Sequence, residues 1–162
     1  MILAIDPGNE QSAYAVLNEE LFPVSFGKVD NRNLLDNITD IVVGNCIKNA
    51  AVEMVACYGM AVGKTVFETC VYIGKLTERL ENNGVKVTYI YRKEEKMNLC
   101  HTMKAKDGNI SQALRDRFGE KGTIKNKGWF FGFKADIWQA YAVGVTYNDI
   151  YCKTGTNTRT IK

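Results

Sequence analysis

The sequence predicts one α/β domain spanning residues 1–162, with a mixed five-stranded sheet flanked by helices. Short apolar runs bounded by Gly, Pro, Asn or Asp predict strands, and longer stretches whose apolar residues recur every three or four positions predict helices. These elements follow the order βββαβαβ, with further helices after the last strand. Three strands in close succession favour an antiparallel meander, whereas strands separated by helices join a sheet in parallel.

The first half of the chain supplies most of the predicted sheet. Strands are expected at 2–6, 12–17, 22–29 and 50–56. The first strand ends at the turn residues Pro7 and Gly8. A helix over 31–48 is indicated by apolar residues at three- and four-residue steps.

The second half begins with a helix predicted over 64–82, whose apolar residues cover more than a narrow stripe. A helix this apolar can pack on the sheet and also on a partner subunit. The fifth strand is expected at 85–91. Two short helices, a Gly-rich basic and aromatic loop, and a final helix follow at 93–101, 109–118, 119–134 and 135–151. The polar tail, 153–162, is expected to be flexible.

Charge is divided unevenly along the chain. Residues 1–83 carry 6 Lys and Arg against 11 Asp and Glu, whereas residues 84–162 carry 15 against 7. This division suits a polyanion held beside a carboxylate site that binds cations, although an unevenly charged solvated surface explains it equally well. No apolar run approaches the ~20 residues of a membrane helix, and the first residues lack the features of a signal peptide. A cytoplasmic protein is therefore expected.

Three carboxylates stand where the sequence is otherwise apolar. Asp6 ends the first strand, Glu53 lies inside the fourth, and Asp136 opens the last helix. Burying a charge without a partner is costly, and no lysine lies in these apolar runs. Mg²⁺ binds oxygen ligands and leaves positions for water and phosphate, so the three acids indicate a metal-dependent site for phosphodiester cleavage. Taken singly, each acid also has a structural explanation, in a turn, on an exposed edge strand or as a helix cap.

These acids lie in motifs that carry a family resemblance. Residues 5–8, Ile-Asp-Pro-Gly, resemble the first catalytic strand of the RuvC family of Holliday-junction resolvases, and Val52-Glu53 before a Gly-containing loop resembles its second motif. Residues 134–143, Lys-Ala-Asp-Ile-Trp-Gln-Ala-Tyr-Ala-Val, are similar to the family's C-terminal helix. Stretches within 91–100, 109–119 and 128–134 are similar to the bacteriophage branch of the family. The resemblance covers nearly the whole chain in the expected order.

The resemblance implies a ribonuclease-H-like fold, a homodimer, and dependence on Mg²⁺ or Mn²⁺. It implies nicking of branched DNA, four-way junctions and also forks, during recombination, repair or phage DNA processing, and a bacterial host cytoplasm if a phage encodes the chain. Asp6, Glu53 and Asp136 take the positions of the family's catalytic metal ligands. Bacterial relatives have another Asp three residues after the helix acid, where this chain has Gln139. A neutral amide oxygen is a weaker ligand, so Gln139 is expected to contribute little to metal binding.

Basic and aromatic residues supply the candidate DNA contacts. Lysine and arginine side chains can bind phosphates without reading sequence, and the candidates are Lys93, Lys96, Lys104, Lys106, Arg115, Arg117, Lys125, Lys127 and Lys134. Tyr58 and Trp129 are candidates for stacking on an unpaired base near a branch point.

Two other functions compete with the nuclease. Gln139 favours a branched-DNA-binding protein with weak or no catalysis, which would bind junctions without metal-dependent cutting. A strand followed by Asp-x-Gly also opens actin-like phosphotransferases. Those proteins need two such domains and further nucleotide-binding segments, which a single 162-residue domain does not supply.

Overall fold

The computed structural model describes residues 1–57, 59 and 61–152. Its strands are β1 (Ile2–Pro7), β2 (Gln11–Leu17), β3 (Pro23–Asp30), β4 (Asn49–Met54) and β5 (Lys86–Tyr91). Its helices are α1 (Asn31–Gly44), α2 (Lys64–Asn82), α3 (Arg92–Cys100), α4 (Asp107–Phe118) and α5 (Ile137–Tyr147). A π-helical turn, η1 (Asn148–Cys152), continues α5. The predicted tail, 153–162, lies outside the described residues.

The five strands form one mixed sheet in the order β3-β2-β1-β4-β5. Strands β1, β2 and β3 pair antiparallel, as the short connections between them predicted. Strands β4 and β5 join on the other side of β1 in parallel, each after a helix. The predicted mixed five-stranded sheet flanked by helices is therefore confirmed. The central position of β1 puts the end of this strand, with Asp6, in the middle of the sheet.

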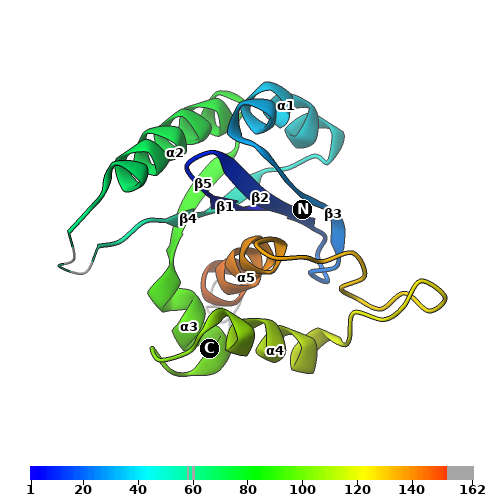
Figure 1. Ribbon diagram of the computed structural model, residues 1–162. Helices are drawn as coiled ribbons and strands as arrows, with labels where there is room; N and C mark the ends of the chain where they lie inside the picture. Colours follow the sequence, from blue (N-terminus) through cyan, green and yellow to red (C-terminus); the bar gives the residue numbers. More distant parts are fainter. Residues whose placement is uncertain (58, 60, 153–162) are drawn as a thin grey trace, which may run out of the picture.

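Helices cover both faces of the sheet (Figure 1). Helices α1 and α2 lie on one face, and the core between them and the sheet includes Leu3, Ile5 and Val52. Helix α5 lies on the other face, where its core includes Ala4 and Ala51, with α3 and α4 beyond it. Because side chains alternate along a strand, Asp6 and Glu53 belong to the same face as Ala4 and Ala51. Both carboxylates therefore lie on the α5 side of the sheet.

Close packing fixes α5 against this face. Nine of its eleven residues are buried, which explains why its sequence is apolar all round. At Gly144 an added Cβ would lie 2.5 Å from Leu17 Cδ1 and 2.9 Å from the Cβ of Ala4. Only glycine allows the helix to approach β1 and β2 this closely. The position of Asp136, immediately before α5, follows from that contact.

The structure corrects two predicted helix ends. Helix α1 ends at Gly44 rather than at 48, because Cys46 adopts a positive φ of 50° and the chain turns. Ile47 was taken as helical from its spacing, but it reaches the core from the turn, where its N–H donates to Val42 O. The last helix begins at Ile137 rather than 135, since Ala135 also has a positive φ, and changes to a π-helical turn after Tyr147.

Within the ranges 1–57, 59 and 61–152, the structure contains no helix that combines the length and the apolar character needed to cross a membrane.

Candidate functional site

The candidate site begins with Asp6 and Glu53, which the sheet brings side by side. Ile5 of β1 pairs in parallel with Val52 of β4, so the next residues of the two strands are neighbours on the α5 face. Both side chains are half-buried. Each strand is apolar up to this position because it forms the centre of the sheet, and β1 then ends at Pro7. The sheet thus brings together two of the three acids that the sequence analysis assigned to one site, and their role as metal ligands stays a prediction.

A cross-strand row extends from this pair to a cation that the sequence analysis missed. Asp6 pairs with Ala13 of β2, and Ala13 pairs with Lys28 of β3, so the three side chains share one face. The Nζ atom of Lys28 donates a hydrogen bond of 2.5 Å to Oδ2 of Asp136. Lys28 therefore joins the last predicted acid to the sheet. Strand alternation could have placed Lys28 on this face, but only the register shows that it stands in the row of Asp6.

The acids of the site act on each other electrostatically. Burial raises the pKa of Asp6 to about 8, and the charge of Glu53, hydrogen bonding with Glu53 and the charge of Asp136 add to the rise, against a lowering by Arg92. Burial likewise raises the pKa of Glu53 to about 7, with a further contribution from Glu95. Carboxyl groups that resist ionisation together in this way define a place where a cation would be stabilised.

A second network, missed from the sequence, supports Glu53 from α3. Arg92 is the first residue of α3, and its guanidinium donates to Oε2 of Glu95 at 2.7 Å and to Oδ1 of Asp107 at the start of α4. Glu95 is fully buried, and its Oε1 has no hydrogen-bond partner. Burial raises the pKa of Glu95 to about 7, while Arg92 lowers it. The position of Arg92, directly after β5, was the available signal, because parallel β4 and β5 end at the same edge of the sheet.

The donor set fits a divalent cation in part. Asp6 and Glu53 are adjacent oxygen donors whose raised pKa values a metal ion would relieve. Asp136 is turned to Lys28. Gln139, one helical turn further, is half-buried, and its Oε1 has no hydrogen-bond partner. As they stand, the described residues contain no group of three His, Cys, Asp or Glu side chains that could hold a metal ion. A third carboxylate ligand would require Asp136 to leave Lys28.

Most of the predicted DNA-contacting lysines are on the surface. Lys96 is half-buried, and the other six are exposed: Lys93, Lys104, Lys106, Lys125, Lys127 and Lys134. Lys134 is also close to Asp136 in sequence. The arginines are engaged within the fold. Arg117 makes two hydrogen bonds to Asp149, at 2.5 and 2.8 Å, and Arg115 lies over the ring of Trp138. Arg117 therefore holds α4 against η1, a role that its sequence position did not reveal.

Of the two aromatic candidates, only Trp129 lies in the described residues, since Tyr58 does not. The Trp129 ring stacks on Phe118 and meets Phe22 edge-on, and its Nε1 donates to the hydroxyl of Tyr141 at 3.0 Å. These contacts give Trp129 a packing role, and because the residue is only half-buried, stacking on a DNA base stays a prediction.

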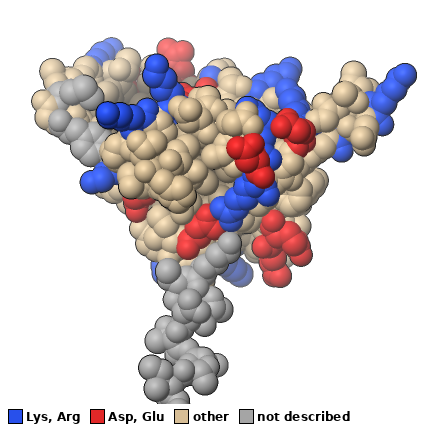
Figure 2. All heavy atoms as spheres, turned by 90° about the horizontal axis from the view of Figure 1, so that it is seen from below, with Lys and Arg blue, Asp and Glu red and all other residues tan. Residues whose placement is uncertain are grey.

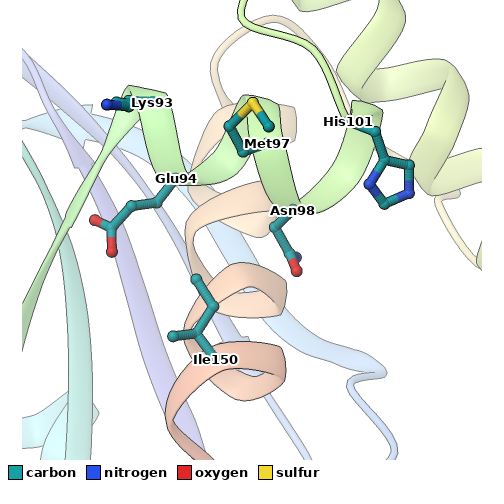
Figure 3. Close-up of a pocket in the computed structure, with 6 residues that line it drawn as sticks. All are labelled: Lys93, Glu94, Met97, Asn98, His101 and Ile150. Carbon is teal, nitrogen blue, oxygen red and sulfur yellow. The ribbon is translucent and has the colours of Figure 1, made fainter.

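Two hollows on the surface differ in their relation to these acids. The larger, about 500 Å³, lies on α3 and η1 and is lined by Lys93, Glu94, Met97, Asn98, His101 and Ile150 (Figure 3). It contains none of the predicted acids. A hollow of about 310 Å³ borders the site itself and is lined by the β1–β2 turn, residues 8–11, with Lys28 and Asp136. The second hollow is smaller, but it is the one that belongs to the candidate site, because Lys28 and Asp136 line it.

Comparisons with known proteins address the fold. No family model matches the sequence, and no curated protein does. Among solved structures, RuvC of Thermus thermophilus is similar at 15% identity and a TM-score of 0.74, over 96% of each chain. T. thermophilus RuvC in complex with a Holliday junction substrate is similar at 14% identity and a TM-score of 0.73, also over 96% of each chain. The chain therefore has the ribonuclease-H-like fold of RuvC, as predicted.

Proposed function

We propose that this protein is a metal-dependent endonuclease that nicks phosphodiesters in branched DNA, in four-way junctions and forks, during recombination, repair or phage DNA processing. The observation that carries the proposal is the pair of half-buried carboxylates, Asp6 and Glu53, at the ends of two parallel strands, with Asp136 close enough to raise the pKa of Asp6. The fold of RuvC, including a RuvC solved with a Holliday junction, supports the choice of substrate.

Asp6, Glu53 and Asp136 would hold Mg²⁺ or Mn²⁺, with the unpartnered Oε1 of Gln139 as a weak additional donor. The metal, when bound, would activate a water and stabilise the leaving oxygen of an in-line displacement. Lys28 lies at the edge of the hollow beside Asp136, so its ammonium group can bind a phosphate once Asp136 is released. Arg92 is hydrogen-bonded to Glu95 and Asp107, and its positive charge lowers the pKa of Glu53.

The DNA would bind through the exposed lysines of the second half of the chain. Such contacts position a backbone without reading its sequence, so selectivity for branches must come from the shape of the DNA. Figure 2 shows the face seen from below, with basic side chains both on the body and on an arm that projects from it. This distribution suits a substrate whose strands leave the site in different directions.

A homodimer would place two such sites on one junction. The outer face of α2 carries Phe67 and Val71, which are 59% and 60% exposed, and Gly74 is open beside them. These residues recur at helical spacing and form an apolar stripe on the opposite layer from α5. A second copy that packs on this stripe would leave both carboxylate sites open. Analytical ultracentrifugation of Phe67→Glu tests the interface, since a charge on the stripe should produce monomers.

Cleavage is tested with labelled four-way junction, fork and linear duplex, each in Mg²⁺, Mn²⁺ or EDTA. We expect metal-dependent nicks in the branched substrates and none with Asp6→Asn, which should still bind. Asp36→Asn, an exposed acid on α1, is the matched control and should cut normally. Equal cutting by Asp6→Asn would reject the site, and equally poor binding of branched and linear DNA would reject the substrate.

The alternative is a branched-DNA-binding protein with little catalysis. Two observations favour it: the neutral Gln139, and the ion pair that turns Asp136 toward Lys28. It predicts tight binding of junctions in the same assay with no nicks in any metal.

A further inference from the structure

Residues 121–128 form a hairpin arm that stands out from the body of the molecule. Gly122 and Lys127 pair across the arm, and the N–H of Gly128 donates to Lys121 O at 3.1 Å. The turn is closed by the N–H of Thr123, which donates to Asn126 O at 2.8 Å. Figures 1 and 2 both show an arm projecting from the body, and in Figure 1 it lies beside the chain that leads into α5.

The two strands of the arm approach each other too closely for side chains at two positions. An added Cβ at Gly122 would lie 2.1 Å from the N of Gly128, and one at Gly128 would lie 2.0 Å from Glu120 O. Gly122 also has a positive φ of 74°. Only glycine therefore fits at these two positions of the arm as it is folded here.

The base of the arm is anchored in the core. Trp129 stacks on Phe118, and the next residue, Phe130, is fully buried. These anchoring residues directly follow the arm in the chain and lie between it and Asp136. The base of the arm is thus held on the same segment that leads to the carboxylate site.

The tip combines an apolar side chain with positive charge. Ile124 is 84% exposed, the most exposed of the large apolar residues that the structure describes. Lys121, Lys125 and Lys127 surround it in sequence, and only Glu120 at the base opposes them. An isolated exposed isoleucine needs no explanation. An isoleucine at the end of a basic projection that is anchored at its base has the chemistry of a wedge for nucleic acid, in which cations hold the phosphates and an apolar side chain enters between bases.

We propose that Ile124 is inserted between bases of the bound DNA and unstacks them at the branch, while the lysines of the arm bind the flanking phosphates. Complementary charge identifies the occupant as a polyanion, and unpaired or weakly stacked bases at a branch are the least costly to separate. This inference rests on the proposed function, because it assumes that branched DNA is the substrate.

The test uses a four-way junction with 2-aminopurine at the branch, whose fluorescence rises when the base is unstacked. The full chain is compared with Ile124→Ser, Ile124→Leu and Val43→Ser. Val43 is 67% exposed on α1 and serves as a matched loss of an exposed aliphatic side chain. We expect wild type, Ile124→Leu and Val43→Ser to raise the fluorescence, and Ile124→Ser to abolish the rise and weaken binding roughly tenfold. Thermal unfolding should be the same for all four, since the altered side chains are exposed.

Salt dependence separates the wedge from its lysines. Ile124→Ser should leave the slope of log K against log salt unchanged, whereas Lys125→Gln should reduce its magnitude by about 0.9. If wild type binds and unstacks the junction and Ile124→Ser does so equally, the wedge is refuted and the proposed function stands. If wild type does not prefer the junction to linear duplex, the proposed function fails, and the wedge fails with it.

Discussion

Asp6→Asn should stabilise the metal-free protein, although it removes a residue that the proposed reaction requires. Burial next to Glu53 raises the pKa of Asp6 from 3.8 to about 8. The folded state therefore binds a proton that the unfolded state has released throughout this pH range. Stability falls as pH rises wherever the folded state holds more protons, so wild type should lose stability between about pH 4 and pH 8.

The size of the effect follows from the same shift. One pKa unit corresponds to about 1.4 kcal/mol, so the difference between 3.8 and pH 7 sets an upper limit of about 4 kcal/mol for Asp6 at pH 7. Glu53 titrates with Asp6, so the two contributions do not add independently. An asparagine cannot ionise, and the variant should therefore gain up to this amount at pH 7 and little at pH 4. In a domain of this length, the gain corresponds to roughly 8–16 °C in Tm.

The assay is urea unfolding of wild type, Asp6→Asn and the control Asp36→Asn at pH 5, 6, 7 and 8, in EDTA and in Mg²⁺. In EDTA, the wild-type and Asp36→Asn curves should fall together as pH rises, and the Asp6→Asn curve should be flatter. Mg²⁺ should stabilise wild type more than Asp6→Asn, and more at pH 8 than at pH 5, because protons compete with the metal for the carboxylates. If the free energies of unfolding of wild type and Asp6→Asn change with pH in parallel in EDTA, Asp6 and Glu53 are not a buried pair of mutually repelling carboxylates.

Two further variants test single contacts. Lys28→Ala removes the cation that holds Asp136, so calorimetry should show Mn²⁺ binding to the DNA-free variant about 2- to 5-fold more tightly than to wild type. Lys28→Arg keeps the charge and should leave the Mn²⁺ affinity unchanged. Equal affinities for Lys28→Ala and wild type would show that the ion pair does not compete with metal. Tyr141→Phe removes a hydroxyl that donates to Leu21 O and accepts from Trp129, and so leaves two polar groups without partners. Urea unfolding should show that the free energy of unfolding falls by about 1–3 kcal/mol. An unchanged unfolding midpoint would contradict this account.

The elements that could be predicted from sequence are those that depend on local pattern. Apolar periodicity predicted the strands and helices, and chain order predicted how the sheet is connected. Carboxylates inside apolar runs singled out Asp6 and Glu53 as members of one site, and the pairing of β1 with β4 brings them together. The errors arose where an apolar residue reaches the core without being helical, as Ile47 does from the turn after α1.

The residues that sequence reasoning missed depend on register and on contacts between elements. Lys28 looks like a solvent-facing lysine on an edge strand, and only the pairing of β2 with β3 puts it in the row of Asp6. Arg92 and Glu95 are part of a charged stretch typical of an exposed helix. Their burial follows from the packing of α3 against α4 and α5, which no local pattern reveals. Sequence position could have placed Lys28 and Arg92 near the site, but their ion-pair partners are known only from the packing.

These hidden residues change the meaning of Gln139. In the sequence, a neutral amide in place of an acid suggests a site that has lost negative charge and with it part of its affinity for metal. In the structure, the charge of Glu95 raises the pKa of Glu53, and the charge of Asp6 raises the pKa of Glu95. Arg92 offsets part of that charge, but it is shared with Asp107. Glu95 is therefore a further acid beside Asp6 and Glu53 that the sequence analysis did not count, so Gln139 alone does not decide between binding and catalysis.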